Sequence, residues 1–128
     1  SGAPQSGHPA WEPHPIQGWT PDFIPLVLQE TIDKKSYDQL LPVNGDDGVA
    51  WAQKLAKQEG ILTGISGGST FAITMQIAQS AKAESVLLCM LPDTGERYMS
   101  TPLFESIEAE MNAEEEAISR STPTAQME

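Results

Sequence analysis

Two short segments contain the residues whose types and spacing could do chemistry. The first, residues 64–70, reads GISGGST and lies between a short apolar run and a helical pattern. Glycines in such a turn let backbone N–H groups converge at the positive end of a helix, which favours anions and hydrogen-bond acceptors. The segment is neither a GxGxxG motif nor a P-loop, because the P-loop lysine is missing. A tight turn whose glycines only permit close packing is the simpler alternative.

The second segment, residues 91–98, reads LPDTGERY and follows the apolar run of residues 85–91. In parallel α/β sheets the carboxyl ends of the strands form the ligand crevice, and both segments are predicted to lie at such ends. The alternative for this segment is structural: Glu96 and Arg97 form a surface ion pair, and Asp93 stabilises the turn.

Histidine and cysteine do not form a site in this sequence. His8 and His14 lie in a proline-rich opening without a cluster of carboxylates or cysteine, so we expect loop histidines and no metal site. No Ser-His-Asp arrangement can be argued. Cys89 lies inside an apolar run with no base nearby in sequence, which predicts a buried, unreactive thiol.

The elements that must position these segments alternate between strand and helix. Such alternation within about 50 residues predicts an α/β layer with parallel strands. Asp46 and Asp47 are expected to cap the first long helix, and Gly60 to end it. The expected elements are a helix at 26–37, a strand at 39–43, a helix from 46 to 60, an apolar strand at 61–64, a helix at 69–82 and a buried strand at 85–91.

The two ends of the chain differ from its middle. Residues 1–25 hold six of the ten prolines and no Lys or Arg, which predicts an extended segment whose apolar side chains lie against a surface. Residues 105–128 carry a net charge of −6, which predicts a solvated acidic helix followed by a loose end. The expected division is therefore 1–25, 26–104 and 105–128.

Composition excludes several classes of protein. The chain has 128 residues, 39% of them hydrophobic, and a net charge of −11, as in a soluble globular protein. No apolar run approaches ~18 residues, so no transmembrane segment is predicted. A chain this acidic repels phosphate backbones, so nucleic acid is not an expected partner. One cysteine and no recognisable signal peptide favour an intracellular, reducing compartment.

Three segments, in order, resemble the C-terminal part of cysteine synthase, also called O-acetylserine sulfhydrylase. They are PIQG leading to FIP at residues 15–25, EGILTGISGG at 59–68 and LPDTGERYMSTPLF at 91–104. The resemblance implies a partial parallel sheet with covering helices from a tryptophan-synthase-β-like, fold type II enzyme. Such enzymes use pyridoxal phosphate to replace the acetate of O-acetylserine with sulfide, which gives cysteine.

The resemblance also implies roles for two residues. Ser66 matches the serine whose hydroxyl hydrogen-bonds the pyridine nitrogen of the cofactor. A neutral hydroxyl does not hold a proton on that nitrogen, so the ring is a milder electron sink than a carboxylate would make it. Gly18 matches the glycine of the loop that closes over the substrate. Residues 19–22, WTPD, depart from the small, glycine-rich stretch usual there, which points to a changed substrate preference.

The family's Schiff-base lysine, its substrate-carboxylate loop and its cofactor-phosphate loop belong to the N-terminal portion, and no matching motif occurs here. We therefore assign no catalytic residue to this chain and expect it neither to bind the cofactor nor to act by itself. Two interpretations remain open: part of an enzyme whose remainder is absent, or a non-enzymatic subunit or binding module docked on a larger assembly. The implied partners are the remainder of the enzyme or a second subunit, a second copy in a homodimer, and serine acetyltransferase.

Overall fold

A computed structural model describes residues 14–16, 18–19 and 23–121. His8, the Thr20 to Asp22 part of the expected substrate loop and the end of the acidic tail lie outside the described residues. The elements, in order, are α1 (Leu26–Asp33), α2 (Gly45–Lys54), the π-helical turn η1 (Leu55–Glu59), α3 (Ile65–Ala78), the 3₁₀ turn η2 (Gly95–Tyr98) and α4 (Ala113–Ser121).

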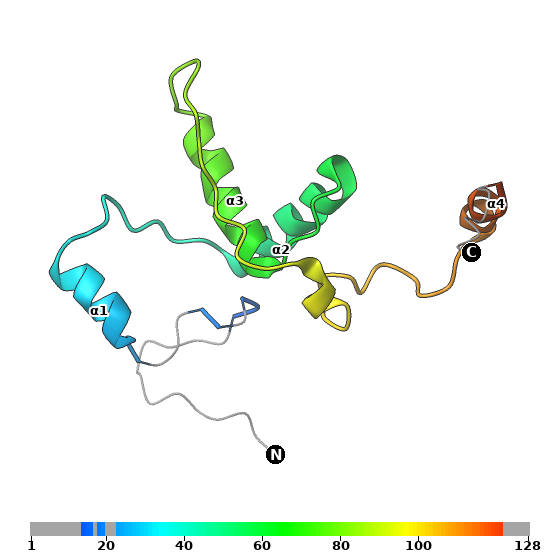
Figure 1. Ribbon diagram of the computed structural model, residues 1–128, viewed down its shortest axis with the longest axis horizontal. Coiled ribbons are helices and arrows are strands. Elements are labelled where there is room, and N and C mark those ends of the chain that lie inside the picture. Colours follow the sequence, from blue (N-terminus) through cyan, green and yellow to red (C-terminus); the bar gives the residue numbers. More distant parts are fainter. Residues whose placement is uncertain (1–13, 17, 20–22, 122–128) are drawn as a thin grey trace, which may run out of the picture.

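Helices α2 and α3 form the centre of the molecule and diverge from a crossing point near their N-terminal ends (Figure 1). Glycines make this crossing close. A Cβ atom on Gly68 would overlap the carbonyl oxygen of Gly48 and lie 2.7 Å from the backbone nitrogen of Ala52. A Cβ atom on Gly48 would in turn overlap the hydroxyl of Ser69, which is fully buried. The two helices therefore meet backbone to backbone.

The hydrophobic core is small and joins segments that are far apart in sequence. Ile16, from the segment before Gly18, packs in the same cluster as Ile65, the first residue of α3. The core thereby attaches the N-terminal segment to the helix that carries Ser66. Its buried members are Ile16, Ala52, Ile65, Tyr98 and Leu103, with Val43, Val49 and Phe104 packed against them.

The helix boundaries differ from the predicted ones in instructive ways. Asn44, rather than Asp46 or Asp47, caps α2: its side-chain oxygen accepts a hydrogen bond from the Asp46 N–H at 3.0 Å. The two aspartates occupy the first turn instead, where their charge favours the helix dipole. Gly60 ends this helical stretch in the left-handed conformation, with φ 68°, as expected.

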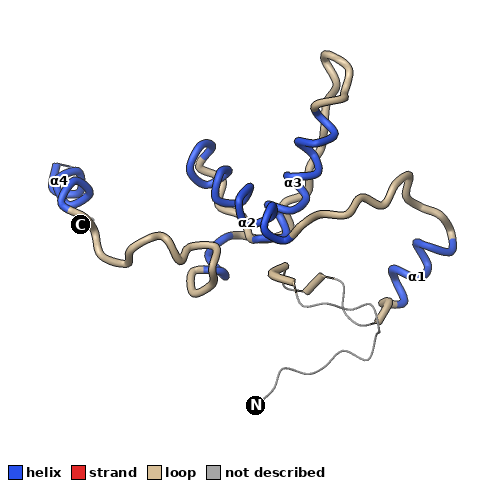
Figure 2. The backbone as a smooth tube through the Cα atoms, turned by 180° about the vertical axis from the view of Figure 1, so that it is seen from behind, coloured by secondary structure: helices blue, strands red, loops and turns tan. Residues whose placement is uncertain are grey.

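The predicted partial parallel sheet is not formed by the described residues, which are helix or loop throughout (Figure 2). Residues 39–43 and 61–64 are loop, except for a single bridge at Thr63. Residues 85–91 turn back along α3, and Met90 accepts a hydrogen bond from the Thr70 hydroxyl at 2.6 Å. A strand needs a neighbouring strand for its N–H and C=O groups, and a helix, whose backbone groups bond internally, offers none.

Large apolar side chains on these segments are exposed as a result. Val86 and Leu88 are 95% and 98% exposed. The chain therefore leaves apolar surface that a folded domain normally covers.

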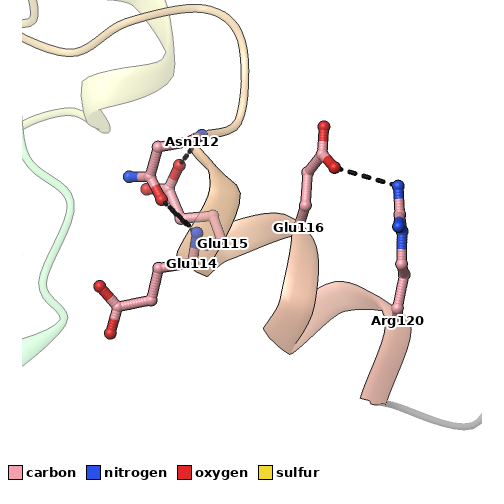
Figure 3. Close-up of polar contacts among 5 residues, drawn as sticks. All are labelled: Asn112, Glu114, Glu115, Glu116 and Arg120. Carbon is pink, nitrogen blue, oxygen red and sulfur yellow. Dashed lines mark hydrogen bonds and ion pairs between the residues drawn. The ribbon is translucent and has the colours of Figure 1, made fainter.

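The outer helices α1 and α4 lie apart from this centre and bury no residue (Figure 1). Helix α4 is held by its own polar contacts (Figure 3). Asn112 Oδ1 accepts hydrogen bonds from the Glu114 and Glu115 N–H groups at 3.0 Å, and the Glu115 carboxylate accepts one from the Asn112 N–H at 2.9 Å. This reciprocal cap explains why an exposed acidic segment is helical. Within the part of the chain described here, no helix has the length and apolar character needed to cross a bilayer.

Candidate functional site

Ser66 lies at the N-terminal end of α3 rather than in a turn before it. The helix was expected from residue 69 but begins at Ile65, directly after the extended residue Gly64. The first N–H groups of a helix lack partners within the helix, and Ser66 is the second residue of α3. The glycine-rich segment is therefore the first turn of the helix, because its glycines pack against α2 and the preceding loop.

The Ser66 hydroxyl differs from its neighbours in having no partner. Ser69 donates its hydroxyl to the Ile65 carbonyl at 2.8 Å, and the Thr70 hydroxyl is shared between the carbonyls of Gly67 at 2.9 Å and Met90 at 2.6 Å. Ser66 is 6% exposed, and its hydroxyl makes no hydrogen bond with any residue that the structure describes. The hydroxyl oxygen is not among the fully buried polar atoms that lack a partner, so it is a neutral hydrogen-bonding group that a ligand can reach.

The two segments singled out in the sequence meet in the structure. Thr63 and Thr94 form an antiparallel bridge, and the Gly95 N–H donates to the Leu62 carbonyl at 3.2 Å. The Thr63 hydroxyl donates to the Asp93 carbonyl, also at 3.2 Å. Residues 91–98 are thus fixed beside the N-terminus of α3, by an antiparallel contact rather than as neighbouring ends of parallel strands.

Asp93 and Tyr98 form a part-buried, hydrogen-bonded polar pair beside the start of α3. The Tyr98 hydroxyl donates to Asp93 Oδ2 at 2.6 Å, and Tyr98 is 7% exposed. This hydrogen bond, together with burial and the aspartate's charge, raises the pKa of Tyr98. The other oxygen, Oδ1, is buried and has no hydrogen-bond partner among the residues that the structure describes. The sequence analysis assigned no role to Tyr98. The signal that could have indicated one is an aromatic residue five positions after Asp93 in a polar turn.

Glu96, Arg97 and Cys89 do not contribute to the contacts between these two segments. Glu96 and Arg97 are both exposed and form no ion pair with each other in the described structure, so the predicted surface pair is absent. Cys89 is half-buried and near the Thr70 hydroxyl, with 3.6 Å between Sγ and Oγ1, so the prediction of a buried thiol was wrong in degree. It is less covered than expected because residues 85–91 have no sheet around them.

Gly18 lies in a turn whose backbone needs glycine. Its φ is 79°, in the left-handed region, and no atom of the described residues lies within 4 Å of where a Cβ would be. A contact of 3.0 Å between His14 Nε2 and the Trp19 carbonyl oxygen closes the turn. Beside it lies an apolar hollow of about 390 Å³, lined by His14, Ile16, Trp19, Leu40, Leu41, Pro42, Val43 and Gly45. The shared core of Ile16 and Ile65 ties this turn to the helix of Ser66.

The described residues contain no group of three or more His, Cys, Asp or Glu side chains that could hold a metal ion. The candidate site therefore consists of hydroxyls, one carboxylate and the N-terminal turn of α3. Such groups can bind a ligand through a neutral hydrogen bond at Ser66 and through backbone N–H groups.

Comparison with known proteins gives consistent relatives. The chain is 45% identical over 98 residues to O-ureido-L-serine synthase of Streptomyces lavendulae and 41% identical over 96 residues to cysteine synthase of Buchnera aphidicola. These matches cover 77% and 74% of this chain but only 29% of each relative. No family model matches.

Solved structures agree with the sequence comparison. A crystal structure of O-ureido-L-serine synthase matches 87% of this chain and 33% of its own, with a TM-score of 0.70 and 41% identity. A cysteine synthase from Entamoeba histolytica matches 78% of this chain and 28% of its own, with a TM-score of 0.56 and 29% identity. By sequence and by fold, this chain belongs with the cysteine synthases and their relatives, and it spans about three tenths of their length.

Proposed function

We propose that this chain is the C-terminal part of a fold type II, pyridoxal-phosphate-dependent enzyme and forms one side of its cofactor cleft. The reaction is replacement of the acetate of O-acetylserine by sulfide, which gives cysteine. The support is the identity of 36 to 45% to cysteine synthases and O-ureido-L-serine synthase. The partner that completes the site is the remainder of the enzyme.

The observation that carries this proposal is the unpartnered hydroxyl of Ser66. A pyridine nitrogen is a neutral acceptor. The Ser66 hydroxyl bonds none of the described residues and is accessible on a residue that is only 6% exposed, so it can donate to such an acceptor. The N-terminal end of α3 adds a positive field at the same place, which disfavours an extra proton on that nitrogen. The residues present therefore fit one edge of the cofactor.

When bound, pyridoxal phosphate supplies an electron sink for loss of a leaving group from the substrate's β-carbon. The residues of this chain bind and orient. Ser66 holds the ring nitrogen without fixing a proton on it, and Gly18 allows the substrate turn its left-handed backbone. We place no acid, base or nucleophile in this chain, and we expect it to be inactive alone.

The exposed apolar segments belong to the same proposal. Val86, Leu88 and Met90 are exposed on residues 85–91, as a strand would be whose neighbours are missing. We expect this segment to join a parallel sheet in the complete enzyme, within a unit at 26–104 flanked by the proline-rich segment 1–25 and the acidic tail 105–128. There its apolar side chains would be covered on both faces.

A second candidate function differs in the nucleophile. The relative with 45% identity is an O-ureido-L-serine synthase, and the chain has a large residue, Trp19, directly after Gly18. Attack by the hydroxyl oxygen of hydroxyurea on the substrate's β-carbon, with loss of acetate, would give O-ureido-L-serine. Assays of the complete enzyme with O-acetylserine and either sulfide or hydroxyurea separate the two functions by their ratio of kcat/KM.

Cofactor binding tests the proposal itself. The complete enzyme should bind one pyridoxal phosphate per chain and show its absorbance, and Ser66→Ala should change that absorbance. Ser80→Ala is the matched control, because the Ser80 hydroxyl is exposed and bonds only the Ile77 carbonyl. A native protein of this length that never binds the cofactor, yet forms a stable complex with a larger assembly, would instead establish the non-enzymatic subunit.

A further inference from the structure

Gly64, two positions before Ser66, is in close contact with side chains from residues 93–98. Gly64 has ordinary extended backbone angles, φ −74° and ψ 178°, so its conformation does not demand glycine. Its surroundings do. A Cβ atom on Gly64 would overlap Asp93 Oδ1 and the ring of Tyr98. The space beside this backbone is thus filled by Asp93 and Tyr98.

The Asp93 side chain is itself held in one orientation. Tyr98 donates its hydroxyl to Oδ2 at 2.6 Å, and Thr63 fixes the Asp93 backbone by a 3.2 Å hydrogen bond to its carbonyl. The buried Oδ1 receives no hydrogen bond from the described part of the chain and lies against Gly64. A continuous line of contacts therefore runs from Tyr98 through Asp93 to Gly64, at the start of the helix that carries Ser66.

We propose that Asp93 and Tyr98 are positioning residues of the Ser66 site. The Tyr98 hydroxyl locks the Asp93 carboxylate against Gly64, and this contact sets where the first turn of α3, and with it the Ser66 hydroxyl, lies. The inference rests on the proposed function only for its effect on the cofactor. The geometry of the turn can be tested without any cofactor.

Hydrogen exchange of the cofactor-free complete enzyme tests the positioning directly. Tyr98→Phe keeps the ring that packs on Gly64 but removes the donor to Asp93. Amide exchange in residues 65–70 should become several-fold faster, while exchange in the outer helix α4 stays unchanged. Tyr37→Phe is the matched control, since Tyr37 is 46% exposed in the loop after α1. Unchanged exchange in residues 65–70 of Tyr98→Phe would overturn the inference.

The loaded enzyme supplies the second readout. Tyr98→Phe and Asp93→Ala should each lower kcat about tenfold with KM changed less, and should alter the pH dependence of the cofactor's absorbance. Asp93→Asn retains an acceptor for the Tyr98 hydroxyl, so it should restore most of kcat and the exchange protection. A loss in Asp93→Asn as large as in Asp93→Ala would overturn the inference, because charge rather than the Tyr98 hydrogen bond would then matter.

The two proposals fail in different ways. If Ser66→Ala leaves the cofactor's absorbance and turnover unchanged, the proposed role of Ser66 is wrong. Faster exchange at residues 65–70 in Tyr98→Phe would still establish that Asp93 and Tyr98 position this turn.

Discussion

The backbone of Gly68 rests on the backbone of Gly48, with the Gly48 carbonyl oxygen in the place that a Cβ of residue 68 would take. This contact fixes how closely α3 approaches α2. Two residues upstream of Gly68 lies Ser66, so the same contact fixes the depth at which Ser66 is buried.

The change in stability caused by Gly68→Ala tests the close contact between α3 and α2, because helix propensity and the contact predict opposite signs. Helix propensity alone predicts that Gly68→Ala stabilises α3 by about 1 kcal/mol. The overlap with backbone atoms of α2 predicts destabilisation of about 1–3 kcal/mol instead. Unfolding of the complete enzyme measures the difference. Gly60→Ala is the comparison, because none of the described atoms lies within 4 Å of its Cβ position and its φ of 68° opposes the change, at about 1–2 kcal/mol. A stabilised Gly68→Ala protein would refute the close crossing.

The isolated 128-residue chain should not form a stable monomer. Its exposed apolar side chains, Val86 and Leu88 among them, lack covering elements. We expect aggregates on size-exclusion chromatography, or a partly molten product with poor amide dispersion. A monomer with a sharp, cooperative melt would contradict this and would favour an independent binding module.

Alkaline pH should weaken the fold through Tyr98. Its pKa is raised from 10.0 in the folded protein, mainly by the hydrogen bond to Asp93. The unfolded chain therefore loses this proton at lower pH than the folded one, and the stabilisation present below about pH 10 is lost as the pH rises further. The free energy of unfolding, measured from pH 8 to 11, should fall more steeply for the native sequence and for Tyr37→Phe than for Tyr98→Phe. Equal slopes of unfolding free energy against pH in the native sequence and in Tyr98→Phe would show that the pKa of Tyr98 is not raised by folding.

Deletion of residues 109–128 should leave cysteine formation by the complete enzyme nearly intact. Helix α4 buries nothing, is capped by its own Asn112 and Glu115, and carries the Glu116–Arg120 ion pair on its surface (Figure 3). Any docking of this acidic tail on a basic partner should fade as salt rises, because charges are screened over ~8 Å at physiological ionic strength. A large loss of turnover at unchanged stability would place the tail in the site.

The family and the proximity of the two candidate segments could be predicted from the sequence, but the geometry of these segments could not. Local signals sufficed for the left-handed Gly60 and for a helix after Gly64. The start of α3 was predicted four residues late, because the glycines suggest a turn when α2, which they pack against, is not considered. The strand at 85–91 was predicted from apolar content alone, and pairing depends on neighbours that the described residues do not supply. The Tyr98–Asp93 hydrogen bond depends on the path of the loop between the two residues, and no sequence pattern predicts that path.

The central claim is that Ser66 holds the ring nitrogen of pyridoxal phosphate, and the Ser66→Ala variant of the complete enzyme tests it most directly. Loss of one neutral hydrogen bond, of about 0.5–1.5 kcal/mol, should lower kcat roughly tenfold and shift the cofactor's absorbance while leaving the thermal midpoint nearly unchanged. A Ser66→Ala enzyme with native absorbance and native turnover would contradict the claim.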